Sequence, residues 1–551
     1  MKKRMVRFMM CVAGMIFFVT GCKSNEVPSR NIKEFTAFFD VEGSEINDDN
    51  TVQDIIGDKI GAKCKEVWLS GQSSQEAIGI MIASGEYPDF LNWSPRLQDA
   101  GAFIPIDAYW EAYPNIRNFW SDIQWESVRQ GDGHIYSIPQ FGNINIKTMD
   151  TQQSSEAFWI QTRVLKWAGY PVIETLDQLF ELLGNYYAAN PVMPDGSPVI
   201  PFGILAYDWY YFCMENPPQF LDGYPNNGSV IVEKETAGVK DYNISETAQR
   251  YFRKLNEQYK KGIVDPEFMT MHHDQFLEKI ASGRMLCMVE QYWDFGGAEE
   301  AIRAQGLEGC TYVPLGITID PGMHEMYYTS NEAATFSGGL SISVDCEDIE
   351  GALQFINDLL SQEIMTLRNW GVEGKDYLAD GEGLYYRTEE MRRNAVNPEY
   401  KASNLCSYSY FPNYIGMNLD GKNAATPNTQ PSEFFAGLAP EVQECLEAYG
   451  ARTYIDMLDY NVIDPEEEPW YPMWTHSNTL TTQTAGGMAW IRMAEVKHNY
   501  LPQVIISQDF DSIWEEYMQA YERCRPEDFL AEMQEEVYRR IELVTGKNIR
   551  P

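Results

Sequence analysis

Two short segments near the start of the chain, rich in apolar and aromatic residues, predict β-strands. The first covers residues 34–39 and the second residues 65–69, and the stretch between them reads as a helix. A strand, a helix and a second strand in this order are typical of an α/β lobe built on a mostly parallel sheet. We therefore predict an α/β fold.

Further along the chain, four segments carry apolar residues at helical spacing. Thr175 and Gln178 form a capping box in front of the first of them, and Ser245 can cap the second. The apolar stripes of these helices should face a hydrophobic core. They lie in residues 176–186, 248–259, 349–360 and 529–541.

Two short alternating segments, residues 144–149 and 338–343, can carry the chain between two lobes, and a new helical pattern follows each. A chain that crosses twice forms two discontinuous lobes with a cleft between them, the geometry of proteins that close around a ligand. The expected organisation is a signal peptide in residues 1–21, a first lobe in 22–149 plus about 330–380, and a second lobe in 150–329 plus about 381–551.

The N-terminus has the pattern of a secretion signal. Residues 2–7 carry four cations and no acid, and residues 8–19 are apolar but fewer than the roughly 20 that a membrane span needs. Residues 19–22 match the bacterial lipobox, in which Cys22 is acylated after cleavage. The prediction is a protein held by lipid at the extracellular face of the bacterial cell membrane. The alternative is an ordinary signal peptide with a chance cysteine.

The net charge of the chain limits which kinds of molecule it can bind. The 551 residues include 42 basic and 81 acidic ones, a net charge of −39, and loss of the four signal cations lowers it to −43. Such a surface repels a phosphate backbone, so no nucleic-acid partner is predicted. Neutral small ligands remain compatible with this charge.

Eight cysteines remain once Cys11 in the signal and the lipobox Cys22 are set aside. They are widely spread, without a CxxC pair or a histidine at ligand spacing, so a zinc site is not predicted. Export permits disulfides, but a chain of this size does not need them, and we predict buried free thiols. The eight are Cys64, Cys213, Cys287, Cys310, Cys346, Cys406, Cys445 and Cys524.

The sequence contains no familiar catalytic motif. It has no HExxH helix, no GxSxG elbow, no P-loop and no GxGxxG after a strand. Residues 272–274, His-His-Asp, are predicted to form a surface turn, because adjacent helical residues point to different sides. With 81 acidic residues, the carboxylate pair of a secreted carbohydrate-active enzyme stays open as an alternative.

Aromatic residues gather in segments that read as loops. An aromatic ring matches the apolar C–H face of a sugar, and Asn, Gln, Asp and Glu side chains can bond its hydroxyls. Most of these rings are expected to belong to the core, and the pattern by itself does not separate them from rings that bind a ligand. The segments are residues 92–93, 207–211, 291–294, 369–371 and 408–414.

A series of short motifs runs in order through nearly the whole chain. The motifs are ASGEYPD (83–89), DGHIYSIP (132–139), FWIQT (158–162), TLDQ (175–178), KGIVDPEF (261–268), ASGR (281–284) and WGVEGKDY (370–377). Together with the lipobox, this series resembles the extracellular solute-binding proteins of bacterial ABC importers. The likeness is to the large lipoprotein subgroup of the sugar-binding class.

The resemblance implies a two-lobed, type II periplasmic-binding-protein-like fold, with discontinuous α/β lobes joined by hinge strands around a ligand cleft. It implies a lipid-anchored monomer that captures an extracellular carbohydrate, in particular a neutral oligosaccharide, and delivers it to ABC transporter permease subunits. No catalysis and no cofactor are expected. A peptide or uronate ligand on the same fold is an alternative, although the candidate loops hold few of the cations that a uronate would need.

Two segments depart from the family pattern. Residues 190–197 lack the acidic ligands with which some relatives hold calcium, so no metal is predicted there, and residues 397–431 match no motif. Motif positions assign stacking to aromatic rings beside the cleft strands and hydroxyl bonding to Asn92, Gln140 and Glu290. The predicted ligand-binding residues are Asn92, Trp93, Gln140, Trp209, Glu290, Tyr292, Trp293 and Trp370.

Overall fold

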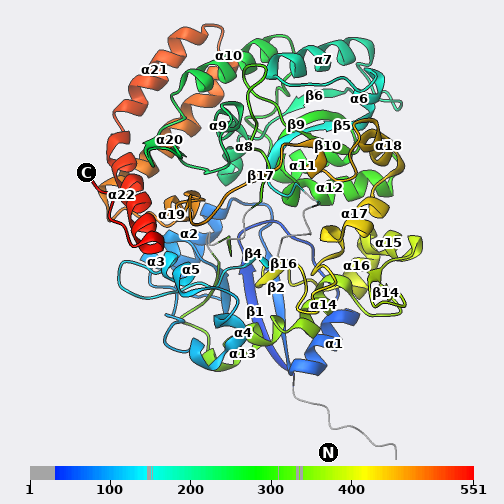
Figure 1. The fold of residues 1–551 in the computed structure, drawn as a ribbon, viewed down its shortest axis with the longest axis vertical. Helices are drawn as coiled ribbons and strands as arrows, with labels where there is room; N and C mark the ends of the chain where they lie inside the picture. The colour runs from blue at the N-terminus through cyan, green and yellow to red at the C-terminus, as the bar shows by residue number, and fades with distance from the viewer. Residues whose placement is uncertain (1–31, 145–150, 152, 308, 331–333, 336–338) are drawn as a thin grey trace, which may run out of the picture.

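The computed structural model describes residues 32–144, 151, 153–307, 309–330, 334–335 and 339–551 (Figure 1). Two four-stranded sheets each organise a separate hydrophobic core, which confirms the predicted α/β class with two lobes. The signal peptide, Cys22 and most of the predicted hinge segment 144–149 lie outside the described residues.

Lobe 1 is built on the sheet β13-β3-β1-β2. β1 (Lys33–Phe39) pairs in parallel with β2 (Ala62–Trp68) and β3 (Phe90–Asn92), and β13 (Leu340–Ile342) adds an antiparallel edge. Alternate residues of β1 are buried, because successive side chains of a strand point to opposite faces of the sheet. The surrounding helices are α1 (Thr51–Ile60), α2 (Ser74–Ser84), α3 (Pro95–Asp99), η1 (Trp110–Ala112), α4 (Pro114–Arg117), α5 (Asp122–Ser127), α13 (Ile349–Leu359), α14 (Gln362–Trp370), α15 (Glu389–Val396) and α16 (Pro398–Asn404).

Lobe 2 is built on the sheet β10-β5-β9-β6, with β5 (Glu156–Gln161), β6 (Ile200–Gly203), β9 (Met285–Gln291) and β10 (Tyr312–Leu315). Every residue of β5 is buried, because protein covers both faces of this sheet. Its helices are α6 (Thr162–Trp167), α7 (Leu176–Ala189), η2 (Asp208–Tyr211), α8 (Phe212–Glu215), α9 (Pro217–Leu221), α10 (Glu246–Lys260), α11 (His273–Ala281), α12 (Tyr292–Ala304), α17 (Pro431–Gly437), α18 (Pro440–Ala448), α19 (Trp474–Ser477), α20 (Ala485–Ile506), α21 (Phe510–Glu522) and α22 (Pro526–Thr545).

The helix signals in the sequence are confirmed at their caps. Thr175 accepts a hydrogen bond from the backbone of Gln178 at the start of α7, and the capping box is complete. Ser245 caps α10 in the same way through Ala248. The stripes near the C-terminus fall within α13 and α22. Across the described ranges, no helix combines the length and the apolar character that crossing a membrane requires.

A small third sheet, β12-β4-β16, lies where the chain passes between the lobes (Figure 1). β4 (Phe141–Ile144) pairs with β12 (Ala334–Thr335) and with β16 (Asn413–Gly416). β13, within the predicted hinge segment 338–343, is hydrogen-bonded to β3 of lobe 1. We therefore propose that the second crossing lies closer to β12. β16 adds a third crossing within the segment that matches no motif.

The hydrophobic cores mark where lobe 1 ends. Cys406, Tyr408, Phe411 and Tyr414 belong to the lobe 1 core, whereas the lobe 2 core takes up residues from Phe434 onward. We therefore propose that lobe 1 extends to about residue 416, in place of the boundary near 380 that the sequence pattern predicts.

The cysteines of the described residues are all buried and unpaired. Burial raises the pKa of the Cys287 and Cys406 thiols, which keeps both protonated at neutral pH. A buried thiol of this kind packs as a small apolar group.

Candidate ligand-binding site between the lobes

Direct side-chain contacts join the two lobes where the strand ends of lobe 1 face lobe 2. The Ser74 backbone N–H, in the first turn of α2, donates to Asp208 Oδ2 of lobe 2 at 2.9 Å. In the loop after β1, Glu42 Oε2 lies 3.3 Å from Nδ1 of His273, the first residue of α11. We call the two facing surfaces that these contacts join the interlobe surface.

On the lobe 1 side, a chain of hydrogen bonds links four polar residues. Gln140 Nε2 donates to Asn92 Oδ1 at 2.8 Å, and Asn92 Nδ2 donates to Asp40 Oδ1 at 2.6 Å. Ser74 Oγ donates to the other oxygen of Asp40 at 2.8 Å. Asp40 and Asn92 stand at the carboxyl ends of the parallel strands β1 and β3, the edge where open α/β sheets bind ligands.

Aromatic rings adjoin these polar groups. The backbone oxygen of Tyr410 accepts a bond from Gln140 at 2.6 Å, and the Tyr410 ring packs edge-on against Trp68 and Phe141. Phe141, at the start of the hinge strand β4, is 39% exposed. Lobe 1 thus presents hydrogen-bonding groups beside an accessible aromatic ring.

Lobe 2 contributes two parallel indoles. Trp209 and Trp293 are stacked with their ring planes 9° apart and their centroids 6.0 Å apart. Trp293, in the first turn of α12, is 47% exposed and donates its indole N–H to Gln291 Oε1. The partner ring Trp209 rests in turn on Tyr210, at 4.0 Å between centroids. The structure therefore brings the predicted residues Trp209 and Trp293 together as a flat apolar platform.

Glu290 lies behind this platform with no exposed surface. Its Oε2 accepts from the Cys213 thiol at 3.0 Å, and its Oε1 accepts from the Gln291 backbone at 2.8 Å. Burial and the nearby Asp294 raise the pKa of Glu290 well above its ordinary value. In this structure Glu290 has no surface on which to make the predicted hydroxyl contact to a sugar.

Three other aromatic rings that were predicted to bind the ligand pack against other side chains of the protein. Trp93 is 6% exposed in a small cluster with Leu97 and donates to Gln98 Oε1, and Trp370 is fully buried with its N–H on the Ala424 backbone. Tyr292 packs against Trp159, Phe295 and Tyr454. Trp93 and Trp370 are buried, whereas Tyr292 stays partly exposed beside its packing partners. We build the candidate site without these three rings.

The sequence interpretation missed several residues of the interlobe surface. Asp40 follows a strand and Ser74 follows a helix cap, and neither belongs to a motif. Tyr410 lies in the aromatic segment 408–414 but was not among the predicted ligand-binding residues. His273 corrects a prediction: it is 3% exposed and held between two carboxylates, not part of a surface turn. Asp208 and Asp294 are sequence neighbours of Trp209 and Trp293. Both lie within aromatic segments that the sequence analysis had already singled out.

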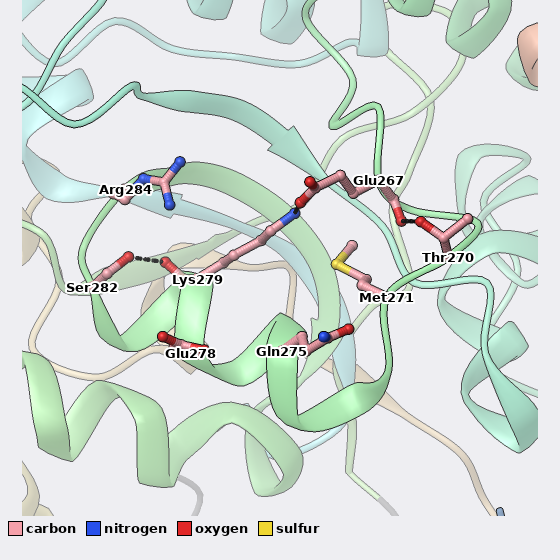
Figure 2. Close-up of a pocket in the computed structure, with 8 residues that line it drawn as sticks. All are labelled: Glu267, Thr270, Met271, Gln275, Glu278, Lys279, Ser282 and Arg284. Atoms are coloured by element: carbon pink, nitrogen blue, oxygen red, sulfur yellow. Dashed lines mark hydrogen bonds and ion pairs between the residues drawn. The ribbon is translucent and has the colours of Figure 1, made fainter.

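A separate hollow of about 370 Å³ runs along α11 and the loop before it (Figure 2). Its lysine, Lys279, is held by Asp265 and Glu267, at 2.6 Å from each. The lining residues differ from those that join the lobes, so this hollow is distinct from the interlobe surface.

The turn in residues 190–197 is closed by its own side chains. Asp195 Oδ1 accepts from both the backbone and the hydroxyl of Ser197, at 2.9 and 2.6 Å. Within the described ranges, no group of three or more His, Cys, Asp or Glu side chains is arranged to hold a metal ion.

Comparison with known proteins places the chain in a family. The family described as bacterial extracellular solute-binding protein matches residues 63–371, more than half of the chain. The chain therefore belongs to the bacterial extracellular solute-binding proteins, a family of binding proteins rather than enzymes.

Two relatives match part of the chain. Lipoprotein LipO of Bacillus subtilis (strain 168) is 24% identical over 340 residues, which cover 58% of this chain and 63% of LipO. The fructooligosaccharide ABC transporter substrate-binding protein FusA of Streptococcus pneumoniae is 22% identical over 236 residues, covering 38% of this chain and 41% of FusA. Both alignments span less than two thirds of the relative.

Solved structures match nearly the whole fold. The FusA EF-hand mutant in complex with fructo-nystose has a TM-score of 0.62 at 15% identity, covering 92% of this chain and 99% of that one. The alginate-binding protein AlgQ2 without calcium ion has a TM-score of 0.61 at 14% identity, covering 92% and 98%. These likenesses confirm the predicted two-lobed, type II architecture.

Proposed function

We propose that this protein is a lipid-anchored substrate-binding protein that captures a neutral oligosaccharide between its lobes and delivers it to an ABC transporter permease. The observation that carries the proposal is the indole platform of Trp293 and Trp209, of which Trp293 is exposed. The residues next to it in the chain, Asp208 and Asp294, take part in the interlobe contacts. A flat apolar ring beside hydrogen-bonding groups is what a sugar ring requires. FusA, which its name describes as a fructooligosaccharide-binding protein, supports this ligand class.

The charges at the interlobe surface favour a neutral ligand over a uronate. Asp40, Glu42, Asp208 and Asp294 bring four carboxyl groups to this region, and the one imidazole among them already faces two of those groups. The carboxylate of a uronate would meet like charge here, whereas the hydroxyls of a neutral sugar can donate to these oxygens.

A thermal-shift screen against glycans tests the proposal. A neutral oligosaccharide at 100 times its Kd should add about 2.7 kcal/mol to the free energy of unfolding. Oligouronates and peptides serve as the comparison set, and the recovered sugar should be chemically unchanged. Stabilisation by uronates or peptides alone would contradict the neutral-sugar assignment, and hydrolysed sugar would favour an enzyme.

The lipid anchor has its own test. Replacing Cys22 with alanine should release the protein into the medium or leave an uncleaved precursor, because the acyl chains supply most of the membrane affinity. Fractionation of cells and mass spectrometry of the mature N-terminus measure this outcome. A mature, unlipidated N-terminus at another residue in the parent protein would show that the anchor assignment is wrong.

A further inference from the structure

A buried imidazole stands between two carboxylates at the interlobe surface. His273 Nδ1 lies 3.3 Å from Glu42 Oε2, and His273 Nε2 lies 2.8 Å from Asp294 Oδ2. The ring is 3% exposed and stacks on Tyr210, at 3.9 Å and 8°. A histidine that faces a carboxylate with each nitrogen donates from both nitrogens, which requires the imidazolium.

These contacts do not all belong to one lobe. His273, Asp294 and Tyr210 are parts of lobe 2, whereas Glu42 comes from the β1–α1 loop of lobe 1. Of the two bonds to His273, parting of the lobes therefore breaks the one to Glu42 and leaves the one to Asp294 in place. The bond to Glu42 joins a buried imidazole to a carboxylate whose side chain is 33% exposed. A charge-assisted bond is stronger than one between neutral groups, so the closed form gains by making it.

We propose that Glu42, His273 and Asp294 form a cross-lobe clasp, which stabilises the closed form of the protein independently of any ligand and weakens as the pH rises. The bond from the Ser74 backbone to Asp208 gives the two lobes a second point of contact close by. The clasp goes beyond the proposed function, since it makes no assumption about the ligand.

Acidic groups surround the imidazole from several elements. Burial by itself disfavours the imidazolium, but the hydrogen bonds to Asp294 and Glu42 outweigh burial and raise the pKa of His273 to about 10. Burial and Asp294 also raise the pKa of Glu290. Burial raises the pKa of Asp294 itself, and the hydrogen bond and charge of His273 act in the opposite direction. The titratable groups facing this region are Glu42 from the β1–α1 loop, Asp294 from α12, Glu290 from β9, Tyr210 from η2 and Tyr410 from lobe 1.

Loss of Glu42 as a partner of His273 on opening determines how the ratio of closed to open molecules depends on pH. Opening removes Glu42 from His273, so the pKa of the imidazole is lower in the open form than the value of about 10 in the closed form. The closed form therefore holds its proton more tightly. The extra stability that protonated His273 gives the closed form is fully present below the pKa of the open form. It is lost as the pH rises toward about 10.

Small-angle X-ray scattering of the full, ligand-free protein tests the clasp. Glu42→Gln removes the charge while keeping the size of the side chain, and it should shift the ratio of open to closed molecules about tenfold at pH 7, seen as a larger radius of gyration. Glu45→Gln, which removes an exposed carboxylate from the same loop, is the matched control and should scatter like the parent.

Circular dichroism shows whether Glu42→Gln folds. If it folds poorly, the pH dependence of scattering by the parent protein still tests the clasp. The parent should open as the pH rises from 7 to 10, and a folded Glu42→Gln variant should lose that response. Identical scattering of the parent at both pH values overturns the clasp, as does equal opening by Glu42→Gln and Glu45→Gln. Because no sugar is present, these outcomes do not depend on the glycan screen.

Discussion

Replacing Trp293 with alanine is expected to weaken binding of the oligosaccharide by about 2–4 kcal/mol, the range for an aromatic hot spot, or roughly 30- to 700-fold in Kd. The reason is that Trp293 presents the accessible face of the stacked pair, being 47% exposed with Trp209 behind it. Stability should change little, because removal of a half-exposed ring leaves no closed cavity. Titration calorimetry and thermal melting measure the two effects.

Trp167 offers the matched control. It is 49% exposed, at the end of α6, and packs edge-on against Tyr186 rather than against the interlobe surface. Trp167→Ala should therefore retain the parent's affinity. Equal loss of affinity in both variants, or a Trp293→Ala protein that melts far lower yet binds normally, would show that the platform is not the sugar site.

Replacing Trp370 with alanine should lower the stability of the protein and leave its affinity for the ligand unchanged, the reverse of Trp293→Ala. The ring is fully buried in lobe 1 between Tyr377 and Tyr385, and its indole N–H donates to the Ala424 backbone at 3.0 Å. Its loss should cost about 3–5 kcal/mol of folding free energy through the cavity alone. The variant should unfold at a lower urea concentration, while the folded fraction keeps the parent's affinity for sugar.

Trp370→Phe separates the two contributions to this effect. Phenylalanine fills much of the cavity but removes the indole donor from the Ala424 oxygen, which keeps only the longer bond from Asn418 Nδ2 at 3.3 Å. Loss of one hydrogen bond of this kind costs about 0.5–1.5 kcal/mol. The phenylalanine variant should therefore lie between the parent and Trp370→Ala in its urea midpoint. An unchanged midpoint for Trp370→Ala together with weaker sugar binding would return this residue to the ligand site.

Local patterns in the sequence predicted much of the architecture. Short apolar and aromatic segments located β1 and β2, and the Thr175 and Ser245 caps located the starts of α7 and α10. The ordered motifs pointed to the solute-binding family, which the family match confirms. These features depend on residues close together in the chain, so they can be read before the fold is known.

Only the tertiary structure decided which aromatic residues are accessible. Trp93 and Trp293 both come just after a strand, β3 or β9, and their motifs look equally suited to a ligand. Trp93 meets Leu97 and Phe103 and is buried, whereas Trp293 begins a helix with one face open. Burial depends on what packs against a ring from distant parts of the chain, and a one-dimensional pattern does not contain that information.

The clasp and the third crossing depend on the same kind of long-range placement. Glu42 and His273 are 231 positions apart, and Gln140 meets Tyr410 across 270 positions. The sequence by itself determined the elements, their caps, the two-lobed class and the family. The tertiary structure decided which side chains face each other between the lobes, because those contacts form only when two separately folded cores are brought together.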